Sequence, residues 1–178
     1  MKKTWFVADT HFGHANIIRH SARPFENVRE MDGAMVANWN AVVQHEDDVW
    51  HLGDFAFRGV KSQSDYLVRL SGRKHLIWGN HDAAIAREAP GWTSSQAMAE
   101  ITVEGVRLVL LHYAMRVWPR SHYGAIHLYG HSHGKLPGDR QSLDVGVDCW
   151  DYRPISLTDI QRRLLALPER GTRSKVSQ

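Results

Sequence analysis

The sequence has very little cysteine and no long apolar run. Cys149 is the single cysteine among 178 residues, so an internal disulfide is excluded and a reducing compartment fits. The N-terminal residues lack the apolar core of about 7–15 residues that a secretory signal requires. No run approaches the roughly 20 apolar residues that span a bilayer. We therefore expect a soluble, cytoplasmic protein with no membrane partner.

Dense runs of lysine and arginine are also absent, although the formal net charge is +3. This mild excess permits a phosphorylated partner, nucleic acid included, but it does not indicate a nucleic-acid-binding surface. No Pro/Gly/Ser-rich linker, internal repeat or low-complexity tract divides the chain. The length predicts a single domain with its own core. We place this domain at residues 1–168 and expect the polar tail at 169–178 to fray.

Short β-rich runs and helical spacings alternate along the first half of the chain, and later runs pair as a hairpin. A capping box at Ser156 predicts a helix that continues to about residue 167. This order favours a mixed α/β domain with two sheets and helices outside them. The expected strands are 4–8, 49–52, 75–78, 101–103, 106–111, 126–129 and 143–147, and the other expected helices are 31–43 and 64–70.

Five of the apolar runs end in a polar cluster. In α/β sheets, ligands bind just beyond the carboxyl ends of the strands, so five such ends meeting at one edge would build one site. A single cluster of this kind is as well explained by a turn or a helix cap, but five in order are hard to obtain by chance. The clusters are Asp9-Thr10-His11, Gly53-Asp54, Gly79-Asn80-His81-Asp82, His112 and Gly130-His131-Ser132-His133.

The residue types in these clusters point to a metal site. Asp9 and His11 lie two positions apart, as do His131 and His133, and in extended chain such pairs point the same way. Each pair can therefore reach one metal ion or two adjacent ones. Carboxylate, amide and imidazole donors without thiolate suit manganese, iron, zinc or nickel better than calcium or a structural zinc site.

Together these motifs resemble the signature of the calcineurin-like metallophosphoesterases, from about residue 5 to residue 133. The short chain is most similar to the small single-domain bacterial and phage-type phosphoesterases of that superfamily. The resemblance implies a four-layer α/β/β/α sandwich of two mixed sheets flanked by helices. It also implies two divalent metal ions, with manganese as the first expectation.

The resemblance implies a role for each matching residue. Asp54 would bridge the two metals. His81 would lie near them without binding them, and Asp82 would orient its ring. The remaining ligands would be Asp9, His11 and His133 for the first metal, and Asn80, His112 and His131 for the second.

These expectations describe a metal-dependent phosphodiesterase that also accepts phosphomonoesters. A hydroxide bridging the metals would attack phosphorus in line with the leaving oxygen, which His81 would protonate. Small phosphate esters, nucleotides among them, are the expected substrates. The alternatives are a phosphoprotein or dinucleoside-polyphosphate phosphatase at the same site, and a non-catalytic metal-binding scaffold. The complete ligand set disfavours the scaffold, and the oligomeric state does not follow from the sequence.

Residues outside the motifs carry weaker predictions. His14 and Arg23 follow the first motif and are candidates to line the phosphate pocket, and Arg116 is a candidate phosphate clamp. A solvated surface is the alternative for each of them. Asp144 and Asp148 flank the end of the last expected strand. Many relatives carry asparagine at the position of Asp144, whose role stays open, while Asp148 is placed where it could approach the site.

Overall fold

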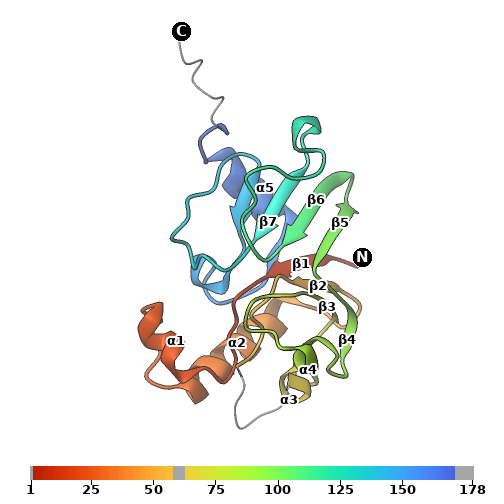
Figure 1. Cartoon of the computed structure of the whole chain (residues 1–178). Coiled ribbons are helices and arrows are strands. Elements are labelled where there is room, and N and C mark those ends of the chain that lie inside the picture. Colours follow the sequence, from red (N-terminus) through yellow and green to blue (C-terminus); the bar gives the residue numbers. More distant parts are fainter. Residues whose placement is uncertain (1, 58–62, 171–178) are drawn as a thin grey trace.

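Two β-sheets form the centre of the computed structural model, which describes residues 2–57 and 63–170 (Figure 1). The five-stranded sheet has the order β4-β3-β2-β1-β9, and the four-stranded sheet has the order β5-β6-β7-β8. In the first sheet β1 to β4 run parallel and β9 is antiparallel to β1. In the second sheet β5 and β6 are antiparallel, while β6, β7 and β8 run parallel. Both sheets are therefore mixed, as expected.

Most of the strands coincide with the apolar runs, but β4 and β9 correspond to none of the expected strands. In the first sheet the strands are β1 (Thr4–Val7), β2 (Asp48–His51), β3 (Arg73–Ile77), β4 (Trp92–Gln96) and β9 (Ile155–Ser156). In the second sheet they are β5 (Met98–Val103), β6 (Val106–Leu111), β7 (Ile126–Tyr129) and β8 (Ser142–Asp144).

Both faces of strand β1 are apolar because each face packs in a different hydrophobic core. Trp5 and Val7 belong to a core on one side of the first sheet, whereas Phe6 and Ala8 belong to a core shared with the second sheet. Alternate residues of a strand point to opposite faces, so a strand buried on both sides reads as a continuous apolar run.

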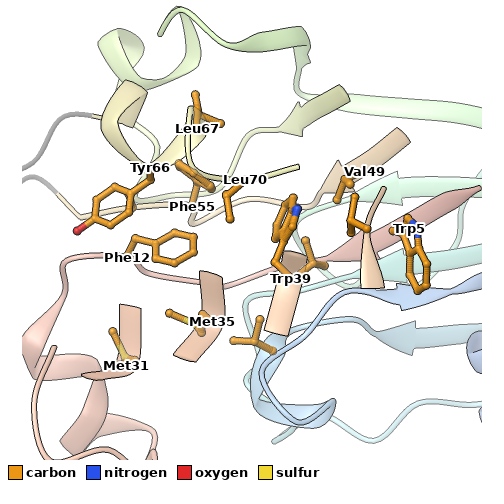
Figure 2. Close-up of a cluster of buried hydrophobic side chains, with 14 of the residues drawn as sticks. Trp5, Phe12, Met31, Met35, Trp39, Val49, Phe55, Tyr66, Leu67 and Leu70 are labelled. Atoms are coloured by element: carbon orange, nitrogen blue, oxygen red, sulfur yellow. The ribbon is translucent and has the colours of Figure 1, made fainter. Parts of the chain in front are cut away.

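Helices cover the outer side of the first sheet. The elements are α1 (Ala15–His20), α2 (Val28–Val42), α3 (Gln63–Leu67) and α4 (Ala84–Arg87). In α2, Met31, Met35 and Trp39 are buried at helical spacing. Figure 2 shows them in one cluster with Trp5 and Val49 of the sheet. Helix α5 (Leu157–Leu165) packs against β1, β8 and β9. The expected architecture of two mixed sheets flanked by helices is confirmed.

Several boundaries differ from the sequence prediction for local reasons. Helix α2 begins three residues early because the Asn27 side chain accepts a hydrogen bond from the backbone N–H of Glu30. The capping box of Ser156 and Asp159 does open α5 as predicted, but the helix ends at Leu165. The last expected strand stops at Asp144, and a 3₁₀ turn follows at Val147–Cys149.

Candidate metal centre

The segments that follow β1, β2, β3, β6 and β7 meet at one place and bring the predicted metal ligands together. Two groups of potential ligand atoms form there, and the atoms within each group lie within 4.8 Å of one another. Each group draws residues from both sheets, because β1 and β2 belong to the first sheet and β6 and β7 to the second. The first group is Asp9, His11 and His133, and the second is Asp54, His112 and His131.

Asp54 belongs to the second group and also lies close to the first. Its Oδ2 atom is 3.6 Å from Nε2 of His11 in the first group and 3.5 Å from Nε2 of His112 in the second. Asn80 joins the second group, because its Oδ1 atom is 3.0 Å from Nε2 of His112 and 2.9 Å from Nδ1 of His131. The structure thus gathers all seven residues that the sequence proposed as metal ligands.

The backbone of the ligand residues is strained. Five of them have positive φ angles, a region that side-chain-bearing residues adopt rarely and at a cost of roughly 1 kcal/mol or more each. The explanation by extended-chain alternation is therefore wrong for both His-containing pairs, although the side chains do converge. The five are Asp9 (57°), His11 (49°), Asp54 (57°), His131 (67°) and His133 (48°).

Glycines next to the ligands are required by space. A Cβ atom on Gly79 would lie 2.3 Å from Oδ1 of Asp54, and one on Gly53 would lie 2.5 Å from Nδ1 of His112. Real Cβ atoms essentially never approach that closely. The turns after β2 and β3 can therefore pack against each other only when both positions are glycine.

Hydrogen bonds fix which ring nitrogen of two histidines faces the centre. Nδ1 of His112 donates to the carbonyl of Leu52 at 2.7 Å, which leaves Nε2 to face Asp54. Nδ1 of His133 donates to Oδ2 of Asp148 at 2.7 Å. A histidine that ligates a metal normally makes such a bond with its other nitrogen. In both rings the second nitrogen, Nε2, is therefore the one oriented towards a metal ion.

His11 provides the clearest test of whether the site fits a metal ion. Both ring nitrogens are buried and have no hydrogen-bond partner among the described residues. Burial lowers the pKa of His11 to about 2, so the ring is neutral and holds a free lone pair. A buried polar atom without a partner is costly, and coordination of a cation would remove that cost.

The two buried carboxylates respond differently to this environment. Burial raises the pKa of Asp9 to about 8, and the neighbouring carboxylates Asp144 and Asp54 add to the rise. Burial would raise the pKa of Asp54 as well, but hydrogen bonds from His112 and from the backbone of His81 hold it well below its usual value. A bound cation would favour the charged form of Asp9 in the same way. The donor set therefore fits divalent metal ions.

Asp82 does not have the predicted role. Its Oδ2 atom accepts hydrogen bonds from the backbone N–H groups of Asp54 and Gly79, each at 2.8 Å, and its Oδ1 atom accepts from Phe55 at 3.1 Å. No bond from Asp82 to the His81 ring occurs in the part of the chain that the structure describes. Instead the backbone N–H of His81 donates to Oδ1 of Asp54 at 2.8 Å. Asp82 thus positions the backbone around the centre.

Arg23 differs from its expected place in a phosphate pocket. Its side chain is fully buried, and it forms a two-pronged ion pair with Asp148 at 2.8 and 2.9 Å. It also donates to the backbone carbonyls of Asp9 at 2.7 Å and Thr10 at 3.0 Å. All three guanidinium nitrogens are therefore engaged within the protein. Arg23 and Asp148 together link the backbone at Asp9 and Thr10 to the ring of His133.

Asp144, whose role the sequence left open, organises the segment that carries His131 and His133. Its Oδ2 atom accepts from the Ser132 hydroxyl at 2.7 Å and from the backbone N–H of Gly134 at 2.9 Å. Its Oδ1 atom accepts from the backbone N–H of Gly146 at 2.7 Å. The sequence held one usable signal for Asp144 and Asp148, which is that Asp144 ends β8 and Asp148 follows it closely, next to the predicted site.

The other two predicted substrate residues have different surroundings. The ring centroid of His14 lies 5.5 Å from that of His11 and 6.3 Å from that of His81, so His14 belongs to the site. Its ring stacks on Phe57 at 4.2 Å. Arg116 is exposed in the segment after β6, and no contact of its side chain with a ligand residue is found in the described chain.

His81 stands at the rim of the centre. Its ring is exposed and lies 5.3 Å, centroid to centroid, from the ring of His11. It is absent from both ligand groups, as expected for a residue that acts beside the metals.

The described residues include no helix that is both long enough and apolar enough to cross a membrane.

Comparison with known proteins identifies relatives of this chain. A family model described as the calcineurin-like phosphoesterase superfamily domain matches residues 3–145. The uncharacterized protein MJ1445 of Methanocaldococcus jannaschii is 32% identical over 166 residues, or 88% of each chain. The gene 66 protein of Mycobacterium phage L5 is 30% identical over 186 residues, covering 84% of this chain and 88% of its own. AQ665 of Aquifex aeolicus, a protein of unknown function, has the same fold, with a TM-score of 0.72, 24% identity, and coverage of 92% of this chain and 100% of its own.

Proposed function

The chain belongs to the calcineurin-like phosphoesterase superfamily, and on that basis we propose that it is a metal-dependent phosphodiesterase that also hydrolyses phosphomonoesters. The observation that carries this proposal is the position of Asp54, which lies within 3.6 Å of a histidine from each of the two ligand groups. A carboxylate so placed suits a centre with two cations.

Two divalent cations, when bound, lower the pKa of a water molecule and offset negative charge on the phosphate oxygens. Asp54, which lies near a histidine of each group, would contact both cations. Manganese is the first candidate for both positions, and iron, zinc or nickel would suit the same oxygen and nitrogen donors. The first cation would be held by Asp9, His11 and His133, and the second by Asn80, His112 and His131.

His81 supplies a proton to the leaving group. Hydrolysis forms a bond from a water oxygen to phosphorus and breaks the ester P–O bond, whose electron pair moves to the leaving oxygen. An alkoxide is a poor leaving group, so protonation of that oxygen accelerates the reaction. Two features support His81 for this task. Its backbone is fixed by Asp54 at 2.8 Å, and its ring stays exposed at the rim.

The decisive experiment compares leaving groups of different basicity. Wild type and His81→Gln, both loaded with manganese, are assayed with diesters of 4-nitrophenol and with diesters of simple alcohols. General-acid catalysis contributes roughly 10²–10⁴-fold. We expect a loss of that size with the alkyl esters and a much smaller loss with the nitrophenyl esters, at unchanged metal content.

The control variant is His45→Gln, which alters an exposed histidine away from the centre. Equal losses on both ester types would show that His81 is not the acid. A wild-type protein that hydrolyses no ester with any of the candidate metals would favour the non-catalytic scaffold.

A further inference from the structure

A hollow of about 340 Å³ adjoins His81. This volume falls within the range of about 300–1,000 Å³ that is typical of small-molecule sites. Its lining combines a cation, an aromatic ring and the proposed general acid. The lining residues are Phe57, Asn80, His81, Asp82, Ala83 and Arg87.

Arg87, at the end of α4, is held in a fixed orientation. Its Nε atom donates to the backbone carbonyl of Asp82 at 2.7 Å, and its guanidinium lies 4.6 Å from the centre of the Trp78 ring. For its two terminal nitrogens, no hydrogen bond or ion pair is found among residues 2–57 and 63–170. Arg23, by contrast, has all its nitrogens engaged.

A half-buried arginine with one nitrogen anchored and two free donors is well suited to bind an anion. Its planar group presents paired donors that match a carboxylate or a phosphate, and little conformational freedom is lost on binding. Because Arg87 lines the hollow, the anion it binds would lie inside the hollow. Asn80, a proposed ligand of the second metal, lines the same hollow, so the anion would lie beside the metal centre.

Phe57 provides an apolar surface at the same hollow. It is 39% exposed, and one face of its ring stacks on His14 with an interplanar angle of 8°. An exposed phenylalanine next to a polar site is able to pack against an aromatic ring of a ligand. The hollow therefore offers contacts for a ring and for a negative charge together.

We propose that this hollow binds the leaving group of the substrate, and that this leaving group carries an aromatic ring and a negative charge. The inference rests on the proposed function, in which His81 protonates the leaving oxygen. A general acid must lie beside the group that it protonates. His81 lines the hollow, so the leaving group lies there. A nucleotide, with its base and its phosphate, has this chemistry.

Two esters that differ by a single charge test the proposal. Methyl 4-carboxyphenyl phosphate and methyl phenyl phosphate are assayed with manganese-loaded wild type, Arg87→Gln and Arg87→Lys. Loss of a charge-assisted hydrogen bond is worth about tenfold. We expect Arg87→Gln to lower kcat/KM about tenfold more for the carboxylated ester than for the phenyl ester, and Arg87→Lys to restore part of that difference.

The ratio of the kcat/KM values for the two esters distinguishes loss of anion recognition from structural damage. Disturbance of the Asp82 backbone by the substitution would lower both rates equally and leave the ratio unchanged. Arg107→Gln, which alters an exposed arginine of β6, is the matched control and should leave both rates and their ratio unchanged. An equal loss on both esters in Arg87→Gln would overturn the proposal.

A binding measurement keeps the test independent of turnover. 4-Hydroxybenzoate and phenol, the two leaving groups, are titrated into the metal-loaded proteins by NMR. We expect wild type to bind 4-hydroxybenzoate about tenfold more tightly than phenol, and Arg87→Gln to lose that preference. Selective binding without hydrolysis of any ester would refute the proposed function but retain the anion site. Hydrolysis without the preference would refute the site alone.

Discussion

The carboxylate of Asp82 accepts a hydrogen bond from the backbone N–H of Asp54 at 2.8 Å, and Asp54 in turn accepts one from the backbone N–H of His81 at the same distance. Asp82 also holds the N–H of Gly79. The ends of β2 and β3 are thereby tied to each other around the carboxylate that lies close to both ligand groups. This arrangement makes Asp82 a positioning residue.

Asp82→Asn should weaken both stability and metal binding. The amide –NH₂ of asparagine cannot accept a hydrogen bond, so at least one of three backbone N–H groups would lose its partner at a site that is only 1% exposed. We expect the free energy of unfolding, measured with urea on metal-free protein, to fall by about 1–3 kcal/mol. The exposed Asp151→Asn serves as the control. Equal stability of the two variants would contradict the assigned role.

Asp148→Asn should weaken the first metal position selectively. Asp148 accepts the Nδ1–H of His133 at 2.7 Å, and partners of this kind typically contribute 10–100-fold to metal affinity. We expect a loss of roughly that size for one of two bound ions, measured by competition with a chromogenic chelator. If both ions dissociate as they do from wild type, the contact with His133 does not support metal binding.

Removal of the metals should destabilise the fold. The unpartnered nitrogens of His11 and the strained backbone at the ligand residues are tolerated best when a cation is bound. A ligand present at 1,000 times its dissociation constant stabilises by about 4 kcal/mol. Dialysis against a chelator should therefore lower the Tm, and added manganese should restore it. An identical Tm with and without manganese would argue against a metal centre.

We expect the free energy of unfolding to fall in mild acid because His51 is buried in its neutral form. Burial lowers the pKa of His51 to about 3, whereas its unfolded value is near 6.5, so the unfolded chain binds a proton that the folded protein excludes. Its contribution is complete above about pH 6.5 and is lost as the pH falls towards 3. Relative to His51→Gln, the free energy of unfolding of metal-free wild type should fall by up to about 1.4 kcal/mol for each pH unit below pH 6.

Urea unfolding between pH 7.5 and 5 measures this difference directly. His45→Gln, at an exposed position, should follow the wild-type curve in parallel. Parallel curves for wild type and His51→Gln would show that His51 does not exclude the proton.

The sequence predicted the ligands well because their signal is local. Each cluster contains ligand-type residues at the end of an apolar run, and this is visible without knowledge of the fold. Strand β4 was missed because Trp92–Gln96 is mostly polar and only partly buried, so it lacks an apolar pattern. The strained φ angles of Asp9 and His11 were missed because nothing in the residue types distinguishes a strained turn from an extended one.

The supporting residues could not be predicted because their partners lie far away along the chain. Arg23 and Asp148 are separated by 125 positions, and Asp82 and Asp54 by 28. The resemblance to the phosphoesterase family implied that the Asp82 side chain orients the His81 ring, whereas in the folded chain its carboxylate accepts hydrogen bonds from backbone groups that follow another strand. Arg87 carries no motif at all, and only the hollow it lines distinguishes it from other arginines.

Each ligand group takes residues from both sheets, so the atoms that would hold cations would also fasten one half of the molecule to the other. A shift of one sheet against the other would alter the spacing of the two cation positions. Mutations in the core between the sheets, far from any ligand, should therefore change chemistry as readily as stability.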